Sequence, residues 1–224
     1  MQPHEVCKKL LPIKASKAQG PDNAPCSIVK EFAYELAEPI TTIFNTSLRS
    51  GIVLVVSKES NKIAIPKIQS PMDESDFRPI SLTSYLSKVF EDFVVTWFID
   101  AVKDKIDPNQ FGCLKGTLTR YCLLDMIHTW LTYLDLPGGR LQLCFLGFSN
   151  ALDRTGYNAL IEKLLGFGMC TSLIPWIISF LSYRQQRAKL GGLISGWLPI
   201  NAGVPQETKP GPILFLVMIT NLSI

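Results

Sequence analysis

The most informative stretch of the sequence reads Cys144-Phe145-Leu146-Gly147-Phe148-Ser149-Asn150-Ala151-Leu152-Asp153. The apolar run that leads into it, Leu141 to Leu146, predicts a strand that is buried on both faces of a sheet. A buried strand that ends on an aspartate is what two-metal phosphoryl transfer requires, because aspartate oxygens hold the two Mg²⁺ ions. Gly147 stands at that position and has no side chain to offer. The stretch therefore predicts a buried strand whose end lacks the carboxylate that such chemistry would use.

The segments on either side predict an α+β fold. A helix is expected from Ser27, as its N-cap, to Gly51, with a kink at Pro39. The other expected helices cover 83–104, 118–134, 156–166, 172–182 and the residues after Gly211-Pro212. Strands are expected at 61–68 and in a hairpin over 185–200 that turns near Gly191-Gly192. Strands and helices that mix without regular alternation are typical of α+β proteins.

The composition excludes several classes of protein. An apolar fraction of 47% with 18% charged residues is incompatible with disorder, and a net charge of +3 permits a nucleic-acid partner without requiring one. The six cysteines are isolated from one another and from histidine, which argues against a zinc site or a disulfide framework. The sequence has no secretory signal and no apolar run long enough to span a membrane, so an intracellular protein without a membrane partner is expected.

A second informative stretch, Gly203-Val204-Pro205-Gln206-Glu207-Thr208, extends the argument. Together with Gly147 to Asp153 it belongs to a series of six segments whose order and spacing resemble those of reverse transcriptases from non-LTR retrotransposons. The six segments are Lys17 to Asp22, Asp76 to Leu82, Asn109 to Gly112, Gly147 to Asp153, Trp176 to Gln186, and Ala202 to Phe215, and the last of these contains the second stretch. The resemblance covers nearly the whole chain and implies an RNA-directed DNA polymerase, with an RNA template, a DNA primer and Mg²⁺.

The resemblance also implies roles for individual residues. Lys67 and Arg78 match the basic positions that hold the incoming triphosphate, a role that suits arginine because its fork can bind phosphate with two hydrogen bonds. Gln206 matches the glutamine that lies against the incoming nucleotide, and Pro205 shapes that loop. Leu152 stands where an aromatic side chain usually blocks the ribose 2′-hydroxyl. Read without the resemblance, these residues would be ordinary surface charges and a simple turn.

Several departures from the family pattern imply that catalysis is lost. The family's usual motif is Asp-Phe-Ser-Lys-Ala-Phe-Asp, and Gly147 stands where its first, metal-binding aspartate would be. Asp153 is the remaining acidic residue of that motif, but about 20 Å of extended chain would separate it from Gly147. Glu207 replaces a glycine and brings a negative charge to a site meant for a triphosphate. No catalytic residue is therefore expected to be intact, and Mg²⁺ is not expected to bind.

The family pattern continues into an Ala-Asp-Asp hairpin and a thumb, neither of which precedes Ile224. A degenerate, C-terminally truncated reverse transcriptase domain is therefore expected, with right-hand fingers and a partial palm interleaved over 51–224 after an N-terminal extension over 1–50. Two other roles stay open: a non-catalytic module that binds single-stranded nucleic acid, and a functionless product of a decaying element. Of these two, the scattered substitutions favour the functionless product. Oligomeric state and template preference are not readable from the sequence.

Overall fold

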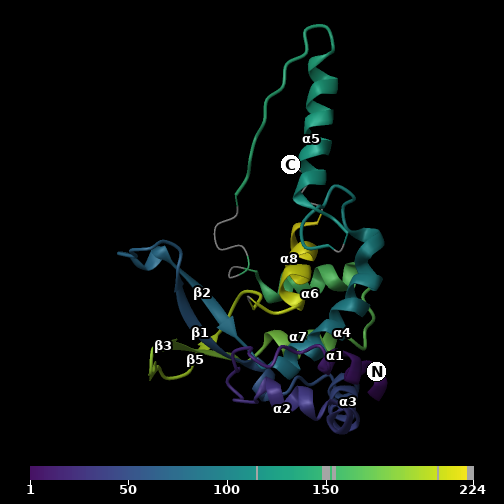
Figure 1. The fold of residues 1–224 in the computed structure, drawn as a ribbon. Helices are drawn as coiled ribbons and strands as arrows, with labels where there is room; N and C mark the ends of the chain where they lie inside the picture. The colour runs from purple at the N-terminus through teal and green to yellow at the C-terminus, as the bar shows by residue number, and fades with distance from the viewer. Residues whose placement is uncertain (115, 148–151, 153–154, 206, 221–224) are drawn as a thin grey trace.

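The computed structural model describes residues 1–114, 116–147, 152, 155–205 and 207–220, and it combines helices with a small sheet (Figure 1). The helices are α1 (Pro3–Leu10), α2 (Cys26–Glu31), α3 (Ala33–Ser50), α4 (Tyr85–Val102), α5 (Thr119–Leu134), α6 (Tyr157–Gly166), α7 (Ile174–Leu181) and α8 (Pro210–Ile219). Three 3₁₀ turns lie at Val55–Lys58, Glu74–Asp76 and Lys103–Lys105. The strands are β1 (Glu59–Pro66), β2 (Phe77–Leu82), β3 (Arg184–Leu190), β4 (Leu193–Ile194) and β5 (Leu198–Ile200). The expected α+β class is confirmed.

The sheet is assembled from two distant parts of the chain. β1 pairs with β2 in antiparallel fashion, so that Lys62 lies opposite Ser81, and with β3 in parallel fashion, so that Ser60 lies opposite Gln186. β3 also pairs with β4 and with β5, both antiparallel. The two-residue turn at Gly191-Gly192, with Gly191 at φ +57°, confirms the expected hairpin. Pairing across more than 120 residues of sequence brings the first and last thirds of the chain together.

The core lies beside this sheet and is centred on an aromatic cluster. Trp176 stacks on Phe180 with ring centroids 5.4 Å apart and meets Phe90 edge to face at 5.3 Å. Phe90 in turn stacks on Phe44 at 4.4 Å. The cluster therefore joins α3, α4 and α7, and the buried side chains of α1, α6 and α8 belong to the same apolar cluster. None of the described helices is long and apolar enough to cross a lipid bilayer.

The first long helix differs from the expectation. The chain breaks the helix at Phe32, whose φ of −97° and ψ of 30° separate α2 from α3, and α3 continues through Pro39. Pro25, not Ser27, occupies the N-cap of α2. Gly51 ends α3 in the left-handed conformation at φ +67°, which a glycine adopts without steric cost. The periodic apolar pattern located the end of this helix correctly and missed its interruption.

The predicted strand from Leu141 to Leu146 is wrong. Residues 141–147 carry no secondary structure and are largely exposed, with Phe145 at 75% and Leu146 at 62% exposure. A strand forms only where its backbone finds a hydrogen-bonding neighbour, and no described strand pairs with this segment. Together with α5, which has no buried residue, the segment projects away from the body of the molecule (Figure 1).

Candidate functional site

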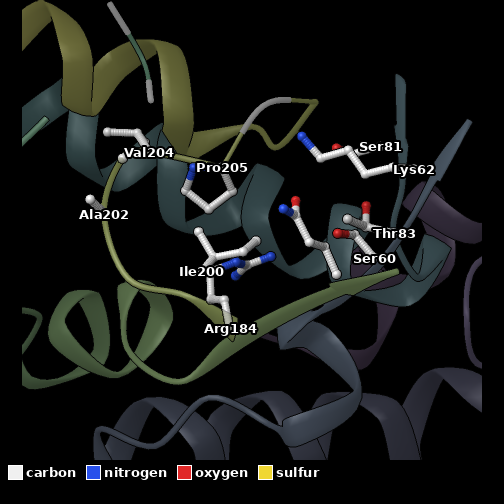
Figure 2. Close-up of a pocket in the computed structure, with 11 residues that line it drawn as sticks. Ser60, Lys62, Ser81, Thr83, Arg184, Ile200, Ala202, Val204 and Pro205 are labelled. Carbon is white, nitrogen blue, oxygen red and sulfur yellow. The ribbon is translucent and has the colours of Figure 1, made fainter. Parts of the chain in front are cut away.

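A polar cavity of about 350 Å³ lies between the sheet and the segment 200–205 (Figure 2). The strands contribute Ser60, Lys62, Ser81, Arg184 and Gln186 to its lining, and Thr83 follows the end of β2. Alternate residues of a strand point to the same face, so Ser60 and Lys62 share one face of β1. Their partners across the ladders, Gln186 and Ser81, extend the same face onto β3 and β2. The polar cavity thus follows from the register of three strands.

The charges of the cavity are positive. Lys62 and Arg184 line it, and among the described residues no aspartate or glutamate does. Arg184 is only 1% exposed and donates from its two terminal nitrogens to the carbonyls of Phe180, at 3.0 Å, and Ser57, at 3.4 Å. Its Nε and the Thr83 hydroxyl are buried without a hydrogen-bond partner among the described residues. Two cations, several hydroxyls and unused donors suit a ligand that is anionic and rich in oxygen acceptors.

The loop that closes the cavity is held by backbone hydrogen bonds. The N–H of Gly203 donates to the carbonyl of Thr155 at 3.2 Å, and the N–H of Val204 donates to the carbonyl of Leu152 at 2.6 Å. Pro205 follows and lines the cavity. Leu152, from the first stretch singled out in the sequence, therefore lies against Val204, from the second.

The start of α8 fixes the other end of this loop. The Thr208 hydroxyl donates to the carbonyl of Pro205 at 2.7 Å and accepts from the N–H of Gly211 at 3.3 Å. A Cβ atom on Gly211 would lie 2.6 Å from the same Pro205 oxygen, which is inside contact distance. Glycine is therefore required at position 211 for the loop to fold back over the first turn of α8.

A buried glutamate supports the loop from α4. Glu91 is 2% exposed, and its carboxylate accepts a hydrogen bond of 2.9 Å from the backbone N–H of Lys209 at the N-cap of α8. Burial raises the pKa of Glu91 to about 7, although that hydrogen bond and the charges of Arg184, Lys88 and Lys209 oppose the rise. The other carboxylate oxygen has no partner among the described residues. A carboxylate at a helix N-terminus is favoured by the helix dipole, which explains its place here.

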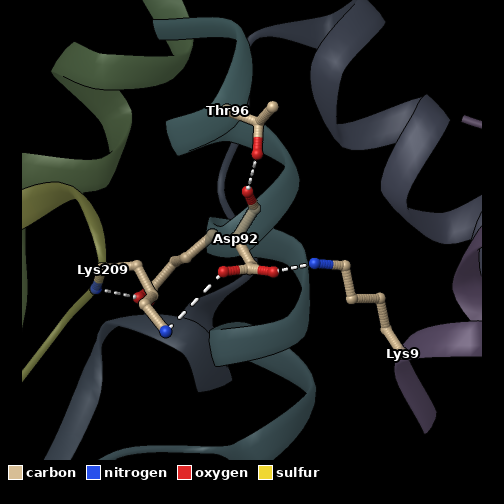
Figure 3. A network of polar contacts seen from close by, with 5 residues as sticks. Lys9, Asp92, Thr96 and Lys209 are labelled. Carbon is tan, nitrogen blue, oxygen red and sulfur yellow. Dashed lines mark hydrogen bonds and ion pairs between the residues drawn. The ribbon is translucent and has the colours of Figure 1, made fainter. Parts of the chain in front are cut away.

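The neighbouring Asp92 ties the N-terminal helix into the same region (Figure 3). Its two oxygens form ion pairs with Lys9 of α1 and, at 3.6 Å, with Lys209. Sequence reasoning missed both acids. The available signal was Glu91 itself, a charged residue on the buried stripe that contains Ser87, Val94 and Phe98 at helical spacing.

Four proteins from flies resemble the chain over almost its full length. It is 27% identical over 228 residues to the "Probable RNA-directed DNA polymerase from transposon BS" of Drosophila melanogaster, with 96% of the chain covered. It is 26% identical over 221 residues to the "RNA-directed DNA polymerase from mobile element jockey" of Drosophila funebris, with 97% covered, and 25% identical over 231 residues to the "Probable RNA-directed DNA polymerase from transposon X-element" of Drosophila melanogaster, with 96% covered. The chain is similar to non-LTR retrotransposon reverse transcriptases. No protein-family model matches it.

The resemblance that the motifs indicated is therefore confirmed. The reverse-transcriptase-like chain spans about a quarter of the length of these relatives, 24% in each of the three cases. The matched region thus corresponds to one part of a much longer polypeptide in the flies. The polymerase activity in the relatives' names is therefore an activity of those full-length proteins.

The reverse-transcriptase-like chain places its two expected phosphate-binding residues away from the cavity. Lys67 follows β1, is exposed, and donates from Nζ to the carbonyl of Ser75 at 2.7 Å. Arg78 is exposed on β2, three residues from Ser81 and thus on the opposite face by strand alternation. Neither residue lines the cavity, whereas Lys62, which was not singled out, does. The alternation of strand 61–68 was the signal that could have identified Lys62.

The remaining expected positions divide into three groups. Pro205 lines the cavity and Leu152 supports its loop. Asp153 and Gln206 lie outside the described residues. Gly147 is exposed, and a Cβ atom added there would meet no atom within 4 Å. No group of three or more potential metal ligands occurs in the described part of the chain, which leaves out Asp153.

Glu207 occupies a backbone conformation that favours the family's glycine. Its φ is +61°, in the left-handed region, where a side chain costs about 1–2 kcal/mol. We expect Glu207→Gly to raise the free energy of unfolding by about 1 kcal/mol, after the entropy cost of glycine is subtracted. Urea denaturation of both proteins measures the change. Glu207→Ala removes the charge without relieving the backbone, so an equal gain from alanine would contradict the conformational explanation.

Proposed function

We propose that the chain is the fingers and partial palm of an RNA-directed DNA polymerase, retained as a binding surface for single-stranded nucleic acid without competent polymerase chemistry. Residues 51–224 would form these interleaved parts, and residues 1–50 would be an extension that braces them. The relatives, whose names give that polymerase activity, support the descent. The cavity between the sheet and segment 200–205 supports the binding role.

The single observation that carries the proposal is the chemistry of this cavity. Its lining combines Lys62 and Arg184 with the hydroxyls of Ser60, Ser81 and Thr83, and the part of it that the structure describes includes no carboxylate. A nucleic-acid backbone supplies what these groups lack, namely negative charge and many acceptor oxygens. Binding through phosphates depends on counterion release and is therefore sensitive to salt.

The catalytic half of the proposal rests on Gly147. A polymerase needs carboxylates that hold two metal ions against the triphosphate and the attacking hydroxyl. Gly147 offers none, and the described residues around it offer no substitute. We therefore expect no template-dependent product in a primer-extension assay with an RNA template and Mg²⁺. Product above the level of a no-protein control would overturn this half of the proposal.

Fluorescence anisotropy with a labelled single-stranded RNA tests the binding half. With two cations in the cavity, the logarithm of the binding constant should fall with the logarithm of salt concentration at a slope of at least about 1.4, so affinity should drop about sevenfold between about 50 and 200 mM salt. Lys62→Ala should weaken binding and reduce the slope by about 0.7.

Lys103→Ala provides the matched control, because Lys103 is an exposed lysine beyond the end of α4, outside the cavity lining. The control should bind as the unchanged protein does. Absence of binding at micromolar protein and low salt would remove the proposal and leave a functionless product as the remaining reading. Equal losses from the two lysine variants would show that binding does not use the cavity.

A further inference from the structure

A second cavity, of about 340 Å³, lies next to the first. Arg184 and Ile200 line both cavities, so these two residues separate them. Of these two cavities, Tyr157 at the start of α6 and Tyr183 just before β3 line only the second. A ligand longer than one nucleotide that occupied the first cavity would therefore meet the second across Ile200.

Two residues that line the second cavity carry hydrogen-bond donors that have no partner, and one of these residues, Arg184, lines the first cavity as well. The Tyr157 hydroxyl and the Arg184 Nε are both buried without a hydrogen-bond partner among the described residues. Burial raises the pKa of Tyr157, so its hydroxyl remains a neutral donor at physiological pH. Leaving buried polar groups unpaired is costly, and a ligand with acceptor oxygens would remove that cost.

Tyr183, which lines this cavity, has an unusually exposed side chain and an unusual backbone conformation. Its side chain is 91% exposed, and its backbone has a φ of +55°, which is rare for a bulky residue. Strained conformations of this kind persist where the surrounding structure imposes them and are concentrated at binding sites. An exposed aromatic ring beside a buried arginine provides the two groups that bind single strands without sequence preference, a stacking surface and a cation.

We propose that the second cavity is a nucleotide subsite, in which the ring of Tyr183 stacks on a base while Arg184 and the Tyr157 hydroxyl bind the adjoining phosphate. The inference rests on the proposed function, because the single-stranded nucleic acid would reach this subsite from the first cavity. The nucleic acid then crosses Ile200, and Arg184 contacts the phosphate backbone at the boundary between the two cavities. Stacking depends on the base, whereas the first cavity is built to contact the backbone.

The experiment measures binding of labelled oligoadenylate RNA to the full chain at several salt concentrations. Tyr183→Ala should weaken binding about tenfold at every salt concentration and leave the salt slope unchanged, because a stacked base contributes without releasing counterions. Tyr183→Phe keeps the ring and should bind as the unchanged protein does. An oligomer of ribose phosphate that lacks bases should bind both Tyr183→Ala and the unchanged protein equally.

Tyr34→Ala is the control, because Tyr34 is a 73% exposed tyrosine on α3 that lines neither cavity. The inference is overturned if Tyr183→Ala binds oligoadenylate as the unchanged protein does, if Tyr34→Ala loses as much, or if the loss persists on the base-free oligomer. Weakening by Lys62→Ala without any effect of Tyr183→Ala would overturn this inference and leave the proposed function standing. Failure of the unchanged protein to bind any RNA would overturn both.

Discussion

Trp176→Ala should lower the free energy of unfolding by about 3–5 kcal/mol, the cost of truncating a fully buried tryptophan. The side chain is 1% exposed and lies between Phe90 and Phe180. Its indole N–H also donates to the Ser47 hydroxyl at 3.2 Å, so the substitution leaves a buried acceptor short of a donor. Since domains are stable by only about 5–15 kcal/mol, the loss would take a large part of the total.

Urea denaturation monitored by far-ultraviolet circular dichroism measures this loss. Trp97→Ala is the matched control, because Trp97 lies on α4 with 39% of its surface exposed. Trp176→Phe, which keeps an aromatic ring in the cluster, should fall between the two. If Trp176→Ala already fails to fold, the order of the other two variants still tests the argument. Equal stabilities for Trp97→Ala and Trp176→Phe would contradict the central position of Trp176.

Local patterns in the sequence located most of the helices. Apolar residues at helical spacing placed α4, α5, α6 and α7 within about two residues of their ends, within the usual uncertainty of helix boundaries. The same patterns failed at Leu141 to Leu146, because an apolar run states only that burial would be favourable. Whether a strand forms depends on a neighbour elsewhere in the chain, and a local pattern contains no information on that neighbour.

In the candidate site, too, the sequence predicted local features and missed those that depend on residues far away in the chain. The sequence singled out the stretches that contain Leu152 and Val204, whereas the hydrogen bond between these two residues came from the structure. The role of Lys62 could not be predicted, because it depends on the parallel pairing of β1 with β3, in which Lys62 lies opposite Ala188, 126 residues away. Glu91 was missed for a related reason, since its partner, the N–H of Lys209, lies 118 residues away.

Glu91→Gln should stabilise the protein at alkaline pH and have little effect at acidic pH. Burial raises the pKa of Glu91 to about 7 in the folded state, from 4.5 for an exposed glutamate. Between these two values the folded protein binds more protons than the unfolded chain, so stability falls as pH rises through this window. Above about pH 7 the full cost is present, about 3 kcal/mol for a shift of this size. Glutamine resembles the protonated acid and can still accept from the Lys209 N–H.

The measurement is the free energy of unfolding in urea at about pH 5 and pH 8, on either side of most of the titration. The unchanged protein should lose stability between the two values, and Glu91→Gln should lose less by up to about 3 kcal/mol. Glu38→Gln, at an exposed position on α3, should follow the unchanged protein. A Glu91→Gln profile parallel to that of the unchanged protein would mean that Glu91 ionises normally. The start of α8 would then not be held by a buried carboxylate whose ionisation is unfavourable.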